Sequence, residues 1–190
     1  MGHSQTNKSE SREKILRAAA DRFREFGVNG IGLDALMKEA GLTHGGFYRH
    51  FSSREELVGE AIEKALQDGS RNVQDTVSRG KELSLEGLVD AYLSKRHRDN
   101  LASSCAVTSL SADTIRSNEH GRSAYTRQVK AYLDLLNGLI EKKEGSEEKV
   151  VLALSTLVGA LSISRAVNDP KLSREILKTT AKELKSYLQS

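Results

Sequence analysis

Apolar residues recur at the three- and four-residue spacing of amphipathic helices from the start of the chain. The first stripe lies within residues 9–26 and consists of Ile15, Leu16, Ala19, Phe23 and Phe26. Gly27 follows it as a natural C-cap, since glycine readily adopts the left-handed conformation that ends many helices. A shorter stripe within 33–40 is again followed by a glycine, Gly41. The pattern therefore predicts two helices separated by a short loop.

The helical pattern continues to the end of the chain. Thr43 is placed to cap a third short helix through Phe51, and Ser52 and Glu55 have the capping-box spacing that starts a fourth. Further helices are predicted at about 84–99, 105–118, 121–142, 147–167 and 172–188. Neither a run of alternating apolar and polar residues nor an internal repeat is found. These patterns predict an all-α fold of about nine helices.

Composition supports this fold and excludes several other classes. The 190 residues are 37% hydrophobic and 29% charged, and a single proline favours long helices. One cysteine excludes a disulfide scaffold and a four-cysteine metal site, and we expect neither a cofactor nor a metal. The first fifteen residues lack the apolar region of a signal peptide, and the apolar run Val150–Ile163 is short and contains serine and threonine, so we expect a cytoplasmic protein without a membrane span.

The segment from Leu33 to Phe51, LDALMKEAGLTHGGFYRHF, has the helix, glycine turn and second helix of a helix-turn-helix. Its second helix would present outward, toward a DNA major groove, the residues Thr43, His44, Gly45, Gly46, Tyr48, Arg49 and His50. The glycine pair makes this helix intrinsically weak, by about 1 kcal/mol per glycine relative to alanine. Two interpretations remain: residues 44–46 form a plain loop, or their missing side chains let the backbone approach DNA closely.

The same region resembles the TetR family of transcriptional regulators. The resemblance covers about residues 10–62 and rests on matched order and spacing, including Lys38-x-Ala40-Gly41-Leu42-Thr43, Gly45-x-Phe47-Tyr48-x-x-Phe51 and Arg54-x-x-Leu57. It implies that Thr43 to Gly46 and Tyr48 to His50 form the recognition helix, and that Arg54 occupies a position where the family usually has a phosphate-contacting lysine. Gly46 departs from the family's usual hydroxyl residue, and Gly32 from its usual Ser or Thr cap.

Beyond residue 56 the resemblance implies a divergent sensing domain. The predicted division is a DNA-binding domain over 1–56 and a helical ligand-sensing and dimerisation domain over 57–190. We expect a small, partly apolar inducer within about 84–167, and the candidate contacts are Tyr92, His97, Cys105 and Tyr125. An alternative interpretation is that these tyrosines, with Tyr132, are core residues and that Cys105 is a packing residue rather than a redox sensor. The histidine and aspartate spacings in this region match no metal site.

The last two predicted helices suggest an interface with a second copy. Their apolar residues are Val150, Leu154, Leu157, Val158, Leu161, Ile176, Leu177 and Leu184. Such helices can form a four-helix interface across a two-fold axis, or instead a core inside one chain. A homodimer is favoured because one short recognition helix reads few base pairs.

Together these patterns predict a ligand-responsive regulator that binds double-stranded DNA. The most specific form is a repressor that binds a palindromic operator as a homodimer and is released by an unknown small-molecule inducer; an activator remains open. An enzyme would need a nucleophile and base, a metal set or a phosphate loop, and none is visible in the sequence. A helical module that has lost DNA binding is the other alternative. We further expect His44 and His50 to gain charge as pH falls through about 6.5 and so to tighten DNA binding.

Overall fold

The computed structural model describes the backbone of residues 2–78, 83–140 and 145–189, with side chains over 7–69, 83–140 and 145–189. Across these ranges every regular element is a helix, which confirms the predicted all-α fold. In chain order the elements are α1 (Gly2–Phe26), α2 (Leu33–Glu39), η1 (His44–Arg49), α3 (Arg54–Ser78), α4 (Leu85–Tyr92), α5 (Lys95–Asp99), α6 (Ala106–Ser109), α7 (Ser111–Thr114), α8 (Glu119–Leu139), α9 (Ser146–Ala166) and α10 (Pro170–Gln189).

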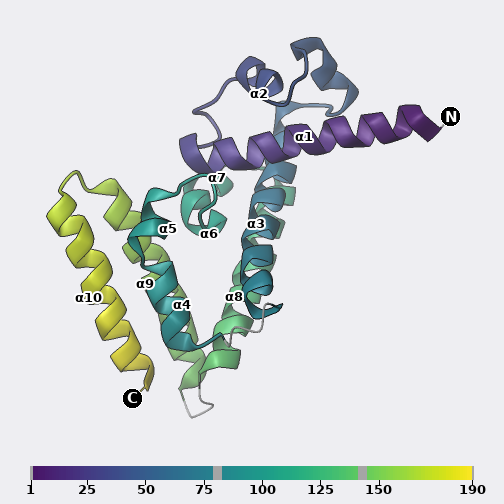
Figure 1. The fold of residues 1–190 in the computed structure, drawn as a ribbon. Coiled ribbons are helices and arrows are strands. Elements are labelled where there is room, and N and C mark those ends of the chain that lie inside the picture. Colours follow the sequence, from purple (N-terminus) through teal and green to yellow (C-terminus); the bar gives the residue numbers. More distant parts are fainter. Residues whose placement is uncertain (1, 79–82, 141–144, 190) are drawn as a thin grey trace.

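The long helices define two parts that share α3 and α8. Helix α1 crosses one end of α3, with α2 beside it, and α8 runs alongside α3 (Figure 1). On the other side α9 packs against α8 and α10, and the short α4 contacts both α9 and α10. The short helices α6 and α7 lie between these parts, because α6 contacts α1, α3, α8 and α9.

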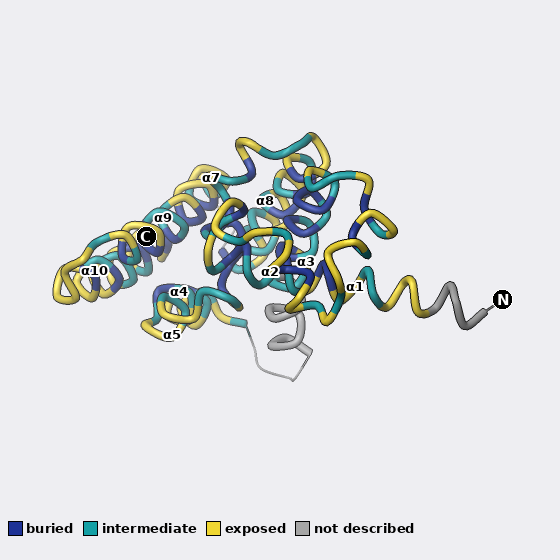
Figure 2. Tube along the Cα trace, turned by 90° about the horizontal axis from the view of Figure 1, so that it is seen from above, coloured by how far each residue is buried: buried dark blue, intermediate teal, exposed yellow. Residues whose placement is uncertain are grey.

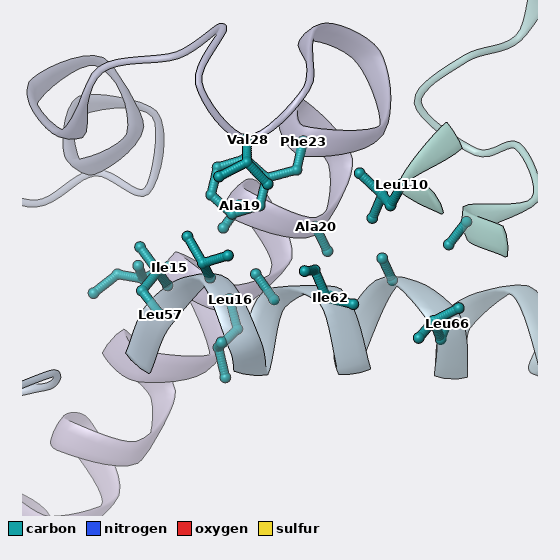
Figure 3. Packing of buried hydrophobic residues seen from close by; sticks show 14 of the residues in the cluster. Ile15, Leu16, Ala19, Ala20, Phe23, Val28, Leu57, Ile62, Leu66 and Leu110 are labelled. Carbon is teal, nitrogen blue, oxygen red and sulfur yellow. The ribbon is translucent and has the colours of Figure 1, made fainter. Parts of the chain in front are cut away.

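Each part has its own hydrophobic core. The first joins α1 to α3 through fully buried side chains such as Ile15, Phe23 and Ile62, with Leu110 contributed from the segment between α6 and α7 (Figure 3). The second lies among α4, α8, α9 and α10, around Val89, Leu157 and Leu161. The predicted division after residue 56 falls in the first turn of α3, and the first core continues to Leu66, so packing is continuous across it.

Several helices differ in detail from the prediction. The segment 84–99 is two helices, because the Ser94 hydroxyl accepts from His97 N and begins α5 anew. The segment 105–118 is likewise divided into α6 and α7. The capping box is shifted by one residue: Ser53 Oγ accepts from Glu56 N, and the Glu56 carboxylate accepts from Ser52 N. Glu56, rather than Glu55, is therefore the acidic member of the box.

Helix α9 combines length with apolar character. Among the described residues it is the one helix long and apolar enough to cross a membrane by length and composition alone. It packs against α8 and α10 and buries seven residues, including Val150, Leu157 and Leu161. These contacts favour the predicted core helix.

Candidate nucleic-acid interface and internal pocket

The helix-turn-helix consists of α2, a glycine turn and η1. Gly41 has a φ of +72°, the left-handed conformation predicted for the turn, and Leu42 N donates to Met37 O at 2.9 Å to close it. Phe47 is fully buried, and its ring stacks on that of Phe51 with centroids 5.5 Å apart. This aromatic pair anchors η1 against the first core and sets which of its faces points outward.

The second helix of the motif is a 3₁₀ helix rather than an α-helix. Gly45 and Gly46 lie inside it, and Thr43 precedes it without making a side-chain capping bond. The plain-loop interpretation of 44–46 is therefore wrong. Thr43, His44, Gly45, Tyr48 and Arg49 are exposed, and Tyr48 retains 67% of its surface. These residues make a continuous outward surface over one short segment.

Arg12 braces this surface, which sequence reasoning missed. Its Nη2 donates to Glu60 Oε1 at 2.6 Å, its Nε donates to His50 O at 3.3 Å, and the guanidinium lies 4.5 Å above the Phe51 ring. The bond to Glu60 is the main reason that the pKa of Arg12 is raised. One side chain of α1 thus fixes the end of η1 against α3.

The two histidines of the motif have different surroundings. His44 pairs through Nδ1 with the Asp34 carboxylate at the start of α2, and both side chains remain exposed. His50 is half-buried, with its Nδ1 buried. Burial, followed by the charges of Lys8, Arg12 and Arg49, lowers the pKa of His50. His50 therefore gains its charge below pH 6.5 in the free protein, which corrects the expectation of a transition near 6.5.

Arg54, the predicted phosphate contact, also makes bonds inside the chain. Its Nη2 donates to Val28 O at 2.7 Å and to Ile31 O at 3.0 Å, both in the loop between α1 and α2. The side chain therefore ties that loop to the start of α3. Its Nε and Nη1 bond to no other described residue, so these nitrogens are available to a phosphate.

A cavity of about 540 Å³ lies in the other half of the chain, among α3, α4, α8, α9 and the segment 97–105. Its apolar lining is Leu83, Leu88, Ala91, Leu135, Leu136, Leu154 and Leu157, with Gly69 and Gly87. Its polar lining is Ser84, Tyr92, His97, Ser103, Ser104, Cys105 and Tyr132. The volume falls within the range of about 300–1,000 Å³ that small-molecule sites have.

The polar groups on the inner wall bond mainly to one another. The Tyr92 hydroxyl pairs with Thr108 Oγ1 at 2.7 Å. His97 Nε2 accepts from Cys105 N at 3.0 Å, so the ring is neutral and its Nδ1 donates to Tyr92 O at 2.7 Å. Burial lowers the pKa of His97 and raises those of Tyr92 and Tyr132. Burial therefore favours the neutral forms of these three side chains.

Three of the four predicted ligand contacts, Tyr92, His97 and Cys105, line this cavity. Tyr125 does not, which corrects that prediction. Its hydroxyl donates to Val107 O at 2.8 Å, and its ring packs against the first core. Burial raises the pKa of Tyr125 to about 12. It is a core tyrosine with a satisfied hydroxyl, the alternative that the sequence left open.

A short path leads from the cavity to the helix-turn-helix. Cys105 lines the cavity and directly precedes α6, whose Val107 is buried in the first core with Leu110. Asp113, in α7, accepts from Val28 N at 3.2 Å in the loop that leads to α2. Helices α6 and α7 therefore touch both the cavity wall and the base of the DNA-binding part.

Six of the eight residues predicted for a dimer interface are buried inside the chain. Leu157 and Leu161 are at most 1% exposed, and Val150, Leu154, Leu177 and Leu184 are at most 8% exposed. Val158 and Ile176 are partly buried against these cores. For the six buried residues the prediction is corrected, because they pack against neighbouring helices of the same chain, whereas for Val158 and Ile176 it stays a prediction. Figure 2 shows the buried sides of α9 and α10 turned inward and their exposed sides along one edge. The exposed large apolar residues of α9 and α10 are Val151, Leu152, Ile163, Leu172 and Tyr187.

Comparisons with known proteins agree with this geometry. Residues 15–61 match the family model described as bacterial regulatory proteins, tetR family. The chain is 28% identical over 161 residues to the HTH-type transcriptional regulator LmrA of Bacillus subtilis, covering 80% of this chain and 82% of LmrA. It is 24% identical over 135 residues to the HTH-type transcriptional repressor NemR of Escherichia coli, covering 70% and 68% of the two chains.

Solved structures show the same fold. The reduced form of E. coli NemR superposes with a TM-score of 0.74 at 19% identity, covering 93% of this chain and 95% of that one. A TetR regulator from Chloroflexus aurantiacus gives a TM-score of 0.76 at 19% identity, covering 97% of both chains. The match spans both halves of the molecule. Residues 15–61 therefore form a DNA-binding helix-turn-helix of the tetR family, and the similarities over the rest of the chain support a TetR-type transcriptional regulator.

Proposed function

We propose that this regulator is a cytoplasmic repressor that binds a palindromic operator as a homodimer and is released when a small molecule enters the cavity. The observation that carries the proposal is the path through α6 and α7, from Cys105 at the cavity wall to the bond between Asp113 and Val28 N. A ligand that moves the start of α6 would move the support of the α1–α2 loop. Repression is supported by the relative NemR, which is named a repressor.

DNA contact is assigned to the outward surface of η1. Arg49 and Tyr48 are exposed on it, and His50 lies among the charges of Lys8, Arg12 and Arg49. An arginine in this position suits a bidentate contact to guanine, whereas Tyr48 and the unbonded nitrogens of Arg54 suit phosphates. Thr43, His44, Gly45 and Gly46 complete the surface that would enter the major groove.

A dimer is assigned to the exposed edge of α9 and α10. Gly159 and Ser162 lie on this edge of α9 beside Leu152 and Ile163, and a Cβ atom at Gly159 would meet nothing within 4 Å in the chain itself. Small side chains let two helices approach closely. A two-fold axis through this edge would give two recognition elements, which in this class of motif read half-sites about 34–36 Å apart.

The decisive experiment removes the link between the cavity and the motif. Operator duplexes are first selected from genomic DNA with the purified full-length protein, and compounds are selected by thermal shift of the same protein. Asp113→Ala should retain operator binding and ligand binding but lose most of the ligand-induced drop in operator affinity, a drop that in allosteric proteins is typically about 5–150-fold.

Asp113→Asn is the matched control, because its side-chain oxygen still accepts from Val28 N. It should respond to ligand nearly as the unmodified protein does. Equal coupling in all three proteins would show that α7 does not carry the signal. A ligand that occupies the cavity without changing operator affinity in the unmodified protein would contradict the proposed release.

A further inference from the structure

The side chains that line the cavity determine which kind of ligand it can bind. Of the sixteen described residues that line it, none is Asp, Glu, Lys or Arg. Arg165 of α9 is not among these lining residues. Its guanidinium donates to His97 O at 2.6 Å, to Arg98 O at 3.0 Å and to Ser109 Oγ at 3.3 Å. The described wall therefore offers no ionic partner to a charged ligand.

The polar groups of the wall are largely occupied within the protein. Both ring nitrogens of His97 are bonded, Tyr92 is paired with Thr108, and Ser104 Oγ is paired with Ser109 Oγ at 2.8 Å. Ser84 Oγ accepts from Gly87 N at 3.1 Å, which leaves its hydroxyl proton free to donate. The described wall thus offers few hydrogen bonds, and most of its lining surface is apolar.

These features select the chemistry of the ligand. An ion moved from water into a site without a counter-ion loses solvation that nothing replaces, whereas an apolar molecule gains free energy in proportion to the area it buries. Resting on the proposed function, we infer that the effector of this regulator is an uncharged, predominantly apolar small molecule. A carbonyl or ether oxygen on it would accept from Ser84.

One side of the cavity is formed by α4 and its N-cap residue. Ser84, Gly87, Leu88 and Ala91 recur at helical spacing and all line the cavity, yet Gly87 and Ala91 are exposed to solvent. A large side chain at Ala91 would project from an exposed position into the cavity and fill it. Such a change alters the cavity with little effect on either hydrophobic core.

The test compares matched neutral and charged probes on the full-length protein. The fluorescence of N-phenyl-1-naphthylamine, a neutral dye, is titrated with protein. Methyl 2-naphthoate, 2-naphthoate and a 2-naphthyltrimethylammonium salt then compete for the site. We expect the ester to displace the dye, and the two ions to bind at least about a hundredfold more weakly, because each leaves an unpaired buried charge. Ala91→Phe should abolish dye binding, and Ala91→Ser should retain it.

Circular dichroism and a single thermal transition near that of the unmodified protein show that both Ala91 variants are folded. Equal affinity for 2-naphthoate and its ester would overturn the inference, as would no dye binding by the unmodified protein or full dye binding by Ala91→Phe. If the ester binds selectively but operator affinity stays constant, the ligand class stands and the proposed release by ligand fails. The two ideas are therefore tested by separate readouts.

Discussion

Arg54 has a structural role in this chain and is also a candidate DNA contact, and the substitution Arg54→Ala tests both roles. The substitution removes two charge-assisted hydrogen bonds, from Nη2 to Val28 O and to Ile31 O. Bonds of this kind contribute about 1.5–3 kcal/mol each when well shielded, and this half-buried side chain should lose about 2–3 kcal/mol in total. For a chain of this length that corresponds to a fall in melting temperature of roughly 4–12 °C.

The assays are thermal unfolding and operator titration at several salt concentrations. Arg54→Lys is the informative comparison, because it keeps the positive charge but cannot reproduce the fork of donors. We expect Arg54→Lys to keep most of the salt dependence of DNA binding while melting well below the unmodified protein. We expect Arg54→Ala to melt low and also to lose about one unit of salt slope. If Arg54→Ala melted at the unmodified temperature and changed only the salt slope, the structural role derived from the loop bonds would be refuted.

Three further outcomes follow from the same structure. Because Arg49 is exposed, Arg49→Ala should leave the melting temperature unchanged, but it should weaken operator binding by about 1–3 kcal/mol and relax the preference at one base pair per half-site. If this variant bound the operator duplex as tightly as the unmodified protein does, the placement of η1 in the major groove would be contradicted. Gly159→Arg should give a monomer by light scattering, with Gly159→Ala remaining dimeric, whereas a dimeric Gly159→Arg would exclude this edge as the interface. The folded chain holds the pKa of His97 below its ordinary value of 6.5, so the folded state binds fewer protons there than the unfolded state. Stability to urea should therefore be highest above pH 6.5 and should fall as the pH drops below it. The variant His97→Gln should show a weaker fall.

The DNA-binding motif was predictable because its sequence signals are local. Gly41 follows an apolar stripe at the position where the turn needs a positive φ, and Phe47 recurs at the spacing that places it in the core. The brace made by Arg12 joins residues 48 positions apart, so no local pattern announces it. The bond between Asp113 and Val28 N spans 85 positions and was likewise invisible in the sequence.

The break that divides the predicted helix over 84–99 into two has a weaker signal in the sequence. The break between α4 and α5 contains neither glycine nor proline, and it depends on Ser94, whose hydroxyl caps α5. Serine is common both inside helices and at their ends, so periodicity alone extended one helix across it. That break matters for the site, because it turns His97 toward the cavity and toward Cys105 N.

The helix α9 shows why an interface is harder to predict than a helix. Its apolar residues surround the axis, so its sequence predicts a buried helix without indicating which side meets the same chain. Periodic hydrophobicity selects large side chains such as Leu157 and Leu161 for the interface, yet neighbouring helices of the same chain cover them. Residues left outside include Gly159 and Ser162, which periodic hydrophobicity does not select. In α9 the chain itself covers the side that carries Leu157 and Leu161. A second copy is then best sought on the side where small residues interrupt the apolar pattern, which is why Gly159 rather than Leu157 is the position to mutate.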